Sequence, residues 1–168
     1  IELTRDVATR FNARYGETFV LPRPDIKREG ARIMALDDPA KKMSKSDRSP
    51  NAAIALTDPP DTIRKKLRRA VTDSGTEVVA GQDKPALTNL LTIYGLFAGL
   101  PLAEVEARFA GQGYGAFKNE LADVVVEKLA PIQARLAELE ANPEIARQFL
   151  AVGADQASAR AAEKMTVV

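Results

Sequence analysis

Apolar residues recur at helical spacing along most of the chain, and glycine or proline marks the positions where each pattern ends. The first apolar stripe has a spacing of four residues and consists of Leu3, Val7, Phe11 and Tyr15. This spacing predicts a helix that Gly16 ends. Phe19 to Pro24 is expected to be extended, because a proline disfavours helical geometry in the residue before it.

A short apolar run interrupts the helical pattern in the first half of the chain. Arg32 to Leu36 predicts a buried strand, and the residues that follow are mostly polar up to Asn51. We expect this polar stretch to form a loop that leaves the end of the strand. Open α/β sheets usually place their ligands at such a position.

A second helix is predicted after this loop. Its apolar face consists of Ile63, Leu67 and Val71. Asp58 is expected to be its N-cap and Pro59 its first residue, and Ser74 with Gly75 should end it. The polar stretch from residue 75 to 84 is typical of a hinge, so we place a domain boundary between residues 75 and 76.

The rest of the chain is predicted to be a bundle of antiparallel helices joined by short loops. One helix begins at Pro85 and ends at Gly99, a short one follows, and a long one comes after the glycines at 111, 113 and 115. The apolar stripes of these helices are Leu87, Leu90, Leu91, Tyr94 and Phe97, then Leu102, Val105 and Phe109, then Phe117, Leu121, Val124, Val125, Leu129, Ile132, Leu136 and Leu139.

A last helix is predicted to begin at Asn142 and Pro143. Its apolar residues Ile145, Phe149 and Val152 are expected to face inward. The predicted fold class is therefore mainly α.

The composition excludes several kinds of site. The 168 residues include no cysteine and no histidine, which excludes disulfides, thiolate metal sites and the usual catalytic base. These residues also contain no run of 18 apolar residues and no secretion leader, so they encode neither a membrane span nor a secretion signal. We expect a cytoplasmic protein with no membrane partner and no metal site.

Positive charge is concentrated in the first half of the chain. Residues 1 to 80 hold 16 Lys and Arg against 12 Asp and Glu, whereas residues 81 to 168 hold 8 against 11. Contacts with polyanions are therefore expected around the polar loop and the helix after it.

The most informative segment is the pentapeptide Lys42, Met43, Ser44, Lys45, Ser46. Two ammonium groups alternate with two hydroxyl groups on a loop, and such groups can neutralise and hold a triphosphate. The alternative is an ordinary solvated loop, because lysine and serine are common surface residues. A given pentapeptide arises by chance in a chain of this length only about once in 10⁴ to 10⁵ sequences, which favours the phosphate-binding interpretation.

Three weaker candidates have structural alternatives. Asp37 and Asp38 are interpreted as part of a turn, with magnesium binding as the alternative. The basic residues of the second helix either contact a nucleic acid or a triphosphate or form a solvated face. Tyr114 either stacks on an unpaired base or packs in the bundle, and packing is favoured. The candidate contact residues on the helix are Arg64, Lys65, Arg68 and Arg69.

The pentapeptide is the second signature motif of class I aminoacyl-tRNA synthetases. The flanking residues resemble bacterial tryptophanyl-tRNA synthetase, and the similarity is densest before residue 75. The similar stretches are Ile1 to Thr4, Arg10 to Asn12, Arg14 to Glu17, Gly30 to Leu36, Asp38 to Pro39, Lys41 to Asp47, Ala70 to Ser74 and Gly113 to Lys118. One departure is Arg48 to Pro50, where many relatives have Pro and Asn directly after the aspartate.

The resemblance implies a C-terminal portion of a tryptophan–tRNA ligase. Residues 1 to 75 would be the C-terminal part of a Rossmann-like catalytic domain, and residues 76 to 168 a helical anticodon-binding domain. The implied substrates are ATP with Mg²⁺, tryptophan and tryptophan tRNA, with no bound cofactor encoded in this chain, and the family is homodimeric. Lys42 and Lys45 would be the catalytic cations. The implied ATP-binding residues are Ile33, Lys42, Met43, Ser44, Lys45 and Ser46.

The resemblance also implies that part of the active site lies outside this sequence. The family's first signature is a turn that contains histidine, and the chain has no histidine. We therefore expect the chain alone to lack activity. Two alternatives remain open, namely a tRNA-binding helical module without catalysis and a fragment of a tyrosyl-tRNA synthetase.

Overall fold

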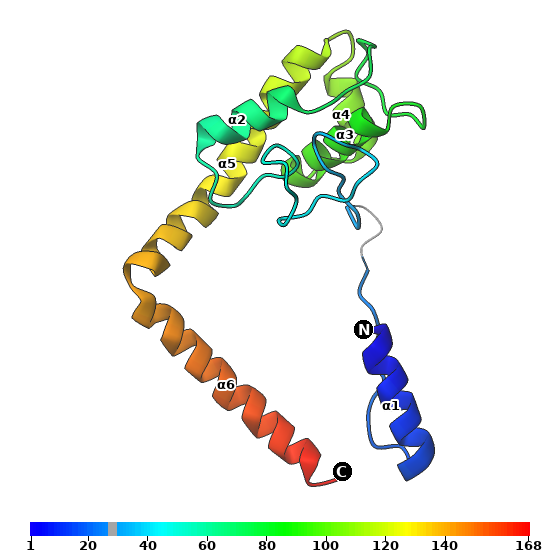
Figure 1. Ribbon diagram of the computed structural model, residues 1–168, viewed down its shortest axis with the longest axis vertical. Coiled ribbons are helices and arrows are strands. Elements are labelled where there is room, and N and C mark those ends of the chain that lie inside the picture. The colour runs from blue at the N-terminus through cyan, green and yellow to red at the C-terminus, as the bar shows by residue number, and fades with distance from the viewer. Residues whose placement is uncertain (27–29) are drawn as a thin grey trace. The chain divides into compact units, whose positions relative to one another are not determined.

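The computed structural model describes residues 1 to 26 and 30 to 168, and these form two compact units (Figure 1). One unit is Lys27–Ala137, and the other combines Ile1–Ile26 with Glu138–Val168. The described residues contain six helices, α1 (Glu2–Tyr15), α2 (Pro60–Arg69), α3 (Pro85–Ala98), α4 (Leu102–Arg108), α5 (Tyr114–Ala141) and α6 (Pro143–Met165). The prediction of a mainly α fold is confirmed.

The hydrophobic core lies in the unit 27–137 and draws on all four of its helices. Three aromatic side chains meet near its centre, with ring centroids 5.3 Å apart for Tyr94 and Phe109 and 5.1 Å apart for Phe109 and Phe117. Ile63 and Leu67 of α2 are fully buried in the same cluster. The core therefore extends across the boundary predicted between residues 75 and 76, and that boundary stays a prediction about the complete enzyme.

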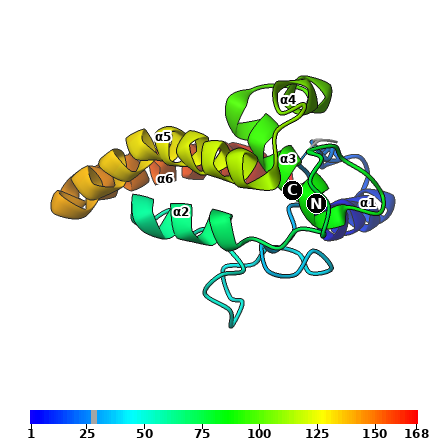
Figure 2. The same ribbon diagram turned by 90° about the horizontal axis from the view of Figure 1, so that it is seen from above.

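Helices α2 and α5 lie side by side and antiparallel (Figures 1 and 2). Polar contacts with α5 run along α2 and along the segments on both sides of it. Each contact joins a side chain of α5 to α2 or to a segment next to it. The pairs are Gln133 with Leu56 and Asp58, Asp123 with Arg64, Asn119 with Arg68, Lys118 with Ala70 and Thr72, and Tyr114 with Asp73. The helix α2 and both of its flanking segments are therefore fixed along α5.

The bounds of α2 differ from those predicted. The N-cap is Pro59 rather than Asp58, whose Oδ2 accepts hydrogen bonds from the Ala55 N–H at 2.9 Å and the Lys66 ammonium at 2.6 Å. The helix ends at Arg69, because the Val71 N–H donates to the Leu36 carbonyl at 2.8 Å instead of continuing the helix. Val71 is consequently 43% exposed rather than part of the buried face.

The predicted strand over residues 32 to 36 is also not a regular strand. Met34 forms an isolated antiparallel bridge with Lys42, and the described residues provide no neighbouring strand that would extend it into a sheet. Ala35 and Leu36 of this segment are nevertheless buried.

In the other unit, residues 16 to 22 fold back along α1. The Asn12 side chain organises this turn, because its Oδ1 accepts from the N–H groups of Thr18 and Phe19 and its Nδ2 donates to the Phe19 carbonyl. The apolar stripe of α1 is largely uncovered, with Leu3 76% and Val7 60% exposed.

The prediction that Phe149 and Val152 of α6 face inward is wrong for this structure. Phe149 is 66% exposed, Val152 is 57% exposed, and α6 has no buried residue. An apolar stripe is buried only where another element covers it, and the unit 1–26 with 138–168 places none over these side chains.

Among the described residues, no single helix is long and apolar enough to cross a membrane. Helices α3 and α4 reach that length and composition only together, and the two are bent by 101°.

Candidate functional site

The lysine loop, residues 42 to 51, starts from a small hairpin. Its base is the anchor segment, residues 33 to 36. The Met43 N–H donates to the Ile33 carbonyl at 2.9 Å, and the Ala35 N–H donates to the Lys41 carbonyl at 2.8 Å. Ile33 and Met43 are thereby brought together, and both pack against the core while remaining half-exposed.

The far end of the loop returns to the same anchor segment. The Leu36 N–H donates to the Ala52 carbonyl at 2.9 Å, and Ala52 is 1% exposed. Both stems of the loop are therefore held by four consecutive residues, while most of the loop between them is exposed.

The serines give the loop its local shape. The hydroxyl groups of Ser44 and Ser46 lie 3.0 Å apart, and the Asp47 N–H donates to the Ser44 carbonyl at 3.3 Å. The Ser49 N–H donates to the Asp47 carboxylate at 2.8 Å. These contacts are all local and exposed, so a bound anion can replace them at little cost.

The lysines in the loop and just before it differ in their partners. Lys41 is paired with Asp38 at 3.1 Å, and this contact raises the pKa of Lys41. Lys42 and Lys45 are exposed and have no ion-pair or hydrogen-bond partner among the described residues. The two predicted catalytic cations are therefore available to an added anion.

The two aspartates considered as magnesium ligands are both engaged within the loop region. Asp37 accepts a hydrogen bond from the Ser49 hydroxyl. The hydrogen bond from Lys41, followed by that from the Ala40 N–H, lowers the pKa of Asp38. Among residues 1 to 26 and 30 to 168, no group of three or more Asp, Glu, His or Cys side chains could hold a metal ion.

The segment between the loop and α2 is held by two side chains that the sequence did not reveal. Lys66, whose side chain is 11% exposed, donates to the Ala53 carbonyl at 2.9 Å as well as to Asp58. Gln133 of α5 donates to the carbonyls of Leu56 and Asp58, both at 2.9 Å. Lysine and glutamine look like ordinary surface residues in a helical pattern, so only their contacts with backbone carbonyls in the folded chain identify them.

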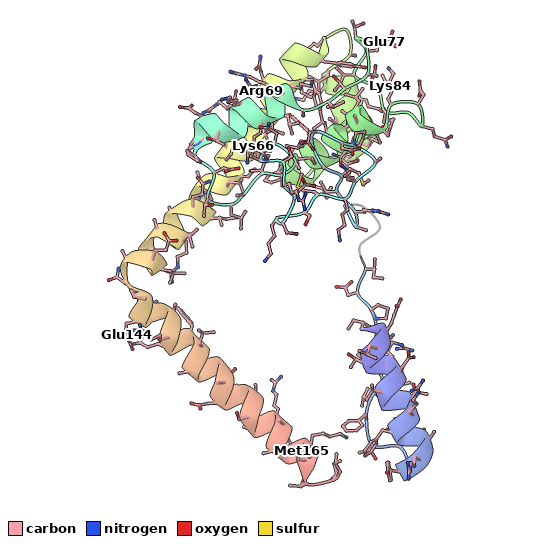
Figure 3. All side chains as sticks on the ribbon, in the orientation of Figure 1. Lys66, Arg69, Glu77, Lys84, Glu144 and Met165 are labelled. Carbon is pink, nitrogen blue, oxygen red and sulfur yellow. The ribbon has the colours of Figure 1, made fainter. Side chains whose placement is uncertain are left out.

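Apart from Lys66, the basic residues of α2 fall into two pairs. The Arg64 guanidinium donates to Asp123 at 3.1 Å, and that of Arg68 donates to Asn119 at 2.8 Å, so both are directed at α5. Lys65 and Arg69 are exposed and have no such partner within the described parts of the chain. Figure 3 shows Arg69 on α2, where it is available to solvent.

Tyr114 is tied into the framework. Its hydroxyl donates to the Asp73 carboxylate, with distances of 2.8 and 3.0 Å to the two oxygens, and its ring packs against the core. Burial and then the hydrogen bond to Asp73 raise the pKa of Tyr114 to about 12. The half-buried position agrees with the favoured interpretation as a packing residue.

Lys118 completes this contact one helical turn later. Its ammonium group donates to the Ala70 carbonyl at 2.7 Å and to the Thr72 hydroxyl at 3.2 Å. Burial lowers the pKa of Lys118. Tyr114 and Lys118 together fix the segment that follows α2.

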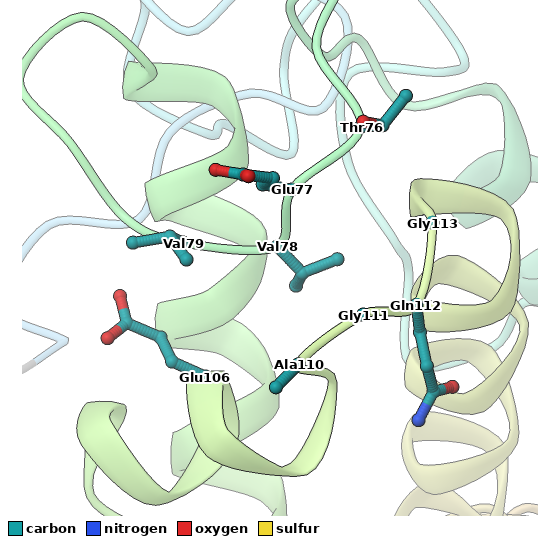
Figure 4. Close-up of a pocket in the computed structure, with 9 residues that line it drawn as sticks. All are labelled: Thr76, Glu77, Val78, Val79, Glu106, Ala110, Gly111, Gln112 and Gly113. Atoms are coloured by element: carbon teal, nitrogen blue, oxygen red, sulfur yellow. The ribbon is translucent and has the colours of Figure 1, made fainter.

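A separate open groove of about 400 Å³ lies between residues 76 to 79 and the turn that leads from α4 to α5 (Figure 4). Its charged side chains are Glu77 and Glu106, and the latter accepts a hydrogen bond from the Ala80 N–H at 2.7 Å. Two carboxylates disfavour phosphate, so this groove is not an extension of the lysine loop.

Comparisons with known proteins show the family to which the chain belongs. Residues 1 to 130 match the family described as tRNA synthetases class I (W and Y). The chain belongs to the class I tRNA synthetases of this tryptophan and tyrosine group. It is 52% identical over 169 residues to the tryptophan–tRNA ligase of Caldanaerobacter subterraneus, which covers all of this chain and 51% of that protein. It is 48% identical over 159 residues to that of Bacillus anthracis, with coverages of 94% and 48%.

Solved structures of such synthetases are similar as well. The tryptophanyl-tRNA synthetase of Mycoplasma pneumoniae matches 99% of this chain and 50% of its own, with a TM-score of 0.89 and 34% identity. That of Campylobacter jejuni, in a complex with ADP and tryptophan, matches 98% of this chain and 50% of its own, with a TM-score of 0.66 and 30% identity. The chain thus spans about half the length of these class I synthetases.

The contact between Tyr114 and Asp73 predicts a pH-dependent stability. The hydrogen bond from Tyr114 lowers the pKa of Asp73 below 3.8 in the folded state. The hydrogen bond therefore stabilises the fold at a pH above the pKa that Asp73 has in the unfolded chain. This stabilisation is lost as the pH falls through the lower pKa that Asp73 has in the folded state. We expect Tyr114→Phe to lower the free energy of unfolding at neutral pH and to have a diminishing effect below about pH 4. Urea unfolding across this pH range measures the difference.

The matched control is Tyr15→Phe, because Tyr15 is 62% exposed and its hydroxyl has no partner among the described residues. This variant should unfold like the wild type at every pH. An effect of Tyr114→Phe that is equally large at acid and neutral pH would contradict the role of Asp73.

Proposed function

We propose that the chain is the part of a tryptophan–tRNA ligase that carries the KMSKS loop. The single observation that carries this proposal is the lysine loop, whose two stems are anchored at residues 33 to 36 while Lys42 and Lys45 remain exposed and unpaired among the described residues. Relatives named tryptophan–tRNA ligase, 48 to 52% identical, support the choice of tryptophan.

In the proposed reaction, the carboxylate of tryptophan attacks the α-phosphorus of ATP and pyrophosphate leaves. The hydroxyl at the 3′ end of tRNA then attacks the aminoacyl carbonyl, and AMP leaves. Negative charge moves onto the departing pyrophosphate in the first step, so the protein accelerates it by placing positive charge there. Lys42 and Lys45 supply this charge from the exposed loop.

The remaining ATP contacts belong to the same proposal. Ser44 and Ser46 hold the phosphates, because their hydroxyl groups are 3.0 Å apart on the exposed side of the loop. Ile33 and Met43 meet at the base of the loop and contact the adenine and ribose side of the nucleotide. Mg²⁺ enters with ATP as part of the substrate.

The location and the assembly of the complete enzyme are also proposed. The enzyme is a cytoplasmic homodimer with the catalytic part ending at about residue 75 and an anticodon-binding part from residue 76 onward. The second half of the chain is acidic overall, which favours a few contacts to unpaired bases over general attraction to RNA.

The role of the loop is tested in a completed enzyme, which we define as this chain joined to the part of the Caldanaerobacter subterraneus relative that it does not cover. Lys45→Ala is expected to lower the rate of tryptophan-dependent exchange between ATP and pyrophosphate by roughly 10² to 10³. Loss of one preorganised charge accounts for this magnitude. The chain alone should show no exchange, because the histidine-containing half of the site is missing.

Lys128→Ala is the matched control, since it removes the same charge from an exposed position on α5. It should keep exchange within about twofold of the wild type, as surface substitutions usually do. Full exchange in Lys45→Ala would contradict the role of this lysine. Exchange with tyrosine in place of tryptophan would instead indicate a tyrosyl-tRNA synthetase.

A tRNA-binding module without catalysis is the second candidate function. It is favoured by the basic face of α2, where Lys65 and Arg69 are exposed and unpaired in the described structure. Arg64, Arg68 and Tyr114 stay candidate tRNA contacts, but each already has a partner on a neighbouring element. Lys65 and Arg69 are therefore the stronger candidates.

Titration of the chain with tryptophan tRNA at two salt concentrations tests this face. Arg69→Ala should weaken binding equally for the natural anticodon and for an altered one, and should reduce the salt slope by about 1. A phosphate contact has this effect because it carries no sequence information. Arg147→Ala, which removes a guanidinium paired with Glu144 on α6, is the control and should leave the slope unchanged.

Wild-type binding that depends on the anticodon would identify the helical part as a recognition module in its own right. An unchanged salt slope in Arg69→Ala would exclude this arginine as a phosphate contact.

A further inference from the structure

Asn89 is the one buried polar side chain among the described residues, with 7% of its surface exposed. It lies on α3 next to the buried Leu90, and α3 contains no charged residue. A buried side-chain amide is costly unless its donor and acceptor are both paired. Its partners therefore indicate what the residue is for.

Both partners of Asn89 belong to Met34 in the anchor segment. Asn89 Oδ1 accepts from the Met34 N–H at 2.8 Å, and Asn89 Nδ2 donates to the Met34 carbonyl at 3.0 Å. The side-chain amide thus pairs with the backbone as a neighbouring strand would, although the two residues are 55 positions apart.

The geometry of the hairpin explains why Met34 needs such a partner. The Ile33 carbonyl and the Ala35 N–H bond to Met43 and Lys41, so these backbone groups point toward the opposite arm of the hairpin. In an antiparallel pair the residue between two bonded positions directs its N–H and C=O to the opposite edge. For Met34 that edge is occupied by Asn89, and no strand among the described residues could replace it.

The position of Met34 determines where the loop begins. Met34 is bridged to Lys42, and its neighbour Ile33 holds Met43. A displacement of Met34 would therefore move the first lysine of the loop and the two residues assigned to the nucleotide. Catalytic rates are sensitive to such shifts, since a misplacement of about 1 Å can cost about 10²-fold.

We propose that Asn89 is a positioning residue for ATP. Through its two hydrogen bonds to Met34, Asn89 fixes the base of the lysine loop. This inference rests on the proposed function of that loop. Asn89 itself does not contact the nucleotide. Its effect should appear in the use of ATP and not in the binding of tryptophan.

Asn89→Asp is the most selective variant. The carboxylate keeps the acceptor for the Met34 N–H but loses the donor and places a negative oxygen against the Met34 carbonyl. Thr92→Val is the matched control. Thr92 lies one turn along the same helix and lines the same open groove as Asn89 and Met34, but its hydroxyl bonds only to the Thr88 carbonyl.

The first measurement is backbone amide hydrogen exchange in the chain itself. In Asn89→Asp the Ala35 and Met43 amides are expected to lose at least about tenfold of their protection relative to the buried Leu91 amide, whereas Thr92→Val should keep it. Unchanged protection of Ala35 and Met43 in the folded variant would overturn the inference. This measurement decides the question even if the completed enzyme shows no activity.

The second measurement is steady-state ATP–pyrophosphate exchange by the completed enzyme. Asn89→Asp should lower kcat/KM for ATP by about 10 to 100-fold and change KM for tryptophan by less than about twofold. Equal losses for ATP and tryptophan would indicate a general structural role and overturn the inference. A wild-type completed enzyme without tryptophan-dependent exchange would instead refute the proposed function.

A second variant covers the case in which Asn89→Asp does not fold. Asn89→Ser keeps one small donor and acceptor and leaves room for a water molecule to reach Met34. It should show the same selective loss for ATP at smaller magnitude. Wild-type behaviour of a folded Asn89→Ser enzyme in both measurements would overturn the inference.

Discussion

The antiparallel contact between α2 and α5 is the interaction on which the rest of the structure depends. Ile63 and Leu67 of α2 and Phe117 and Leu121 of α5 are buried in the same apolar cluster, and side-chain contacts join the two helices at Arg64 and Arg68. The residues just before and just after α2 are bound by Gln133 and by Tyr114 and Lys118 of α5. The same helix therefore fixes the segment between the lysine loop and α2 and the segment that follows α2.

The cations of this region divide into two groups with different roles. Lys41, Lys66, Lys118, Arg64 and Arg68 all bind groups of the protein. Lys42, Lys45, Lys65 and Arg69 have no such partners among the described residues and are exposed. The basic character of this region is thus only partly available to a polyanion, and the available part includes two lysines of the loop and two residues of α2. Charge alone could not have separated these groups, because the partners of Arg64, Arg68 and Lys118 lie about 50 positions or more away in the sequence.

Features set by local sequence were predicted well. The start of α3 at Pro85 and its end before Gly99 follow from proline at the first helical position and from glycine in the left-handed conformation, with φ of 70°. The buried stripe of α3 also agrees with the pattern of the sequence. The Lys-Met-Ser-Lys-Ser motif identified the family because it is specific enough to stand without the fold.

Features that depend on distant partners were not predicted. The Leu36 carbonyl captures the Val71 N–H and so ends α2 earlier than its own residues indicate. Asp58 looks like an N-cap but binds Lys66 instead, and Asn89 looks like a polar interruption of an apolar stripe. A buried asparagine within such a stripe is nevertheless a usable signal, since it must have a partner. The exposed stripe of α6 shows the converse limit, because periodicity identifies an apolar face but not what covers it.

The central claim is that an exposed, charged loop on a fixed base closes on the phosphates of ATP. Limited trypsin digestion of the completed enzyme tests it most directly, because Lys42, Lys45 and Arg48 are all exposed sites for this protease within the loop. Our account predicts that ATP with Mg²⁺ and tryptophan slows cleavage after Lys45 by about tenfold or more, while cleavage after the exposed Arg160 of α6 is unchanged. Cleavage after Lys45 at the same rate with and without these substrates would contradict it.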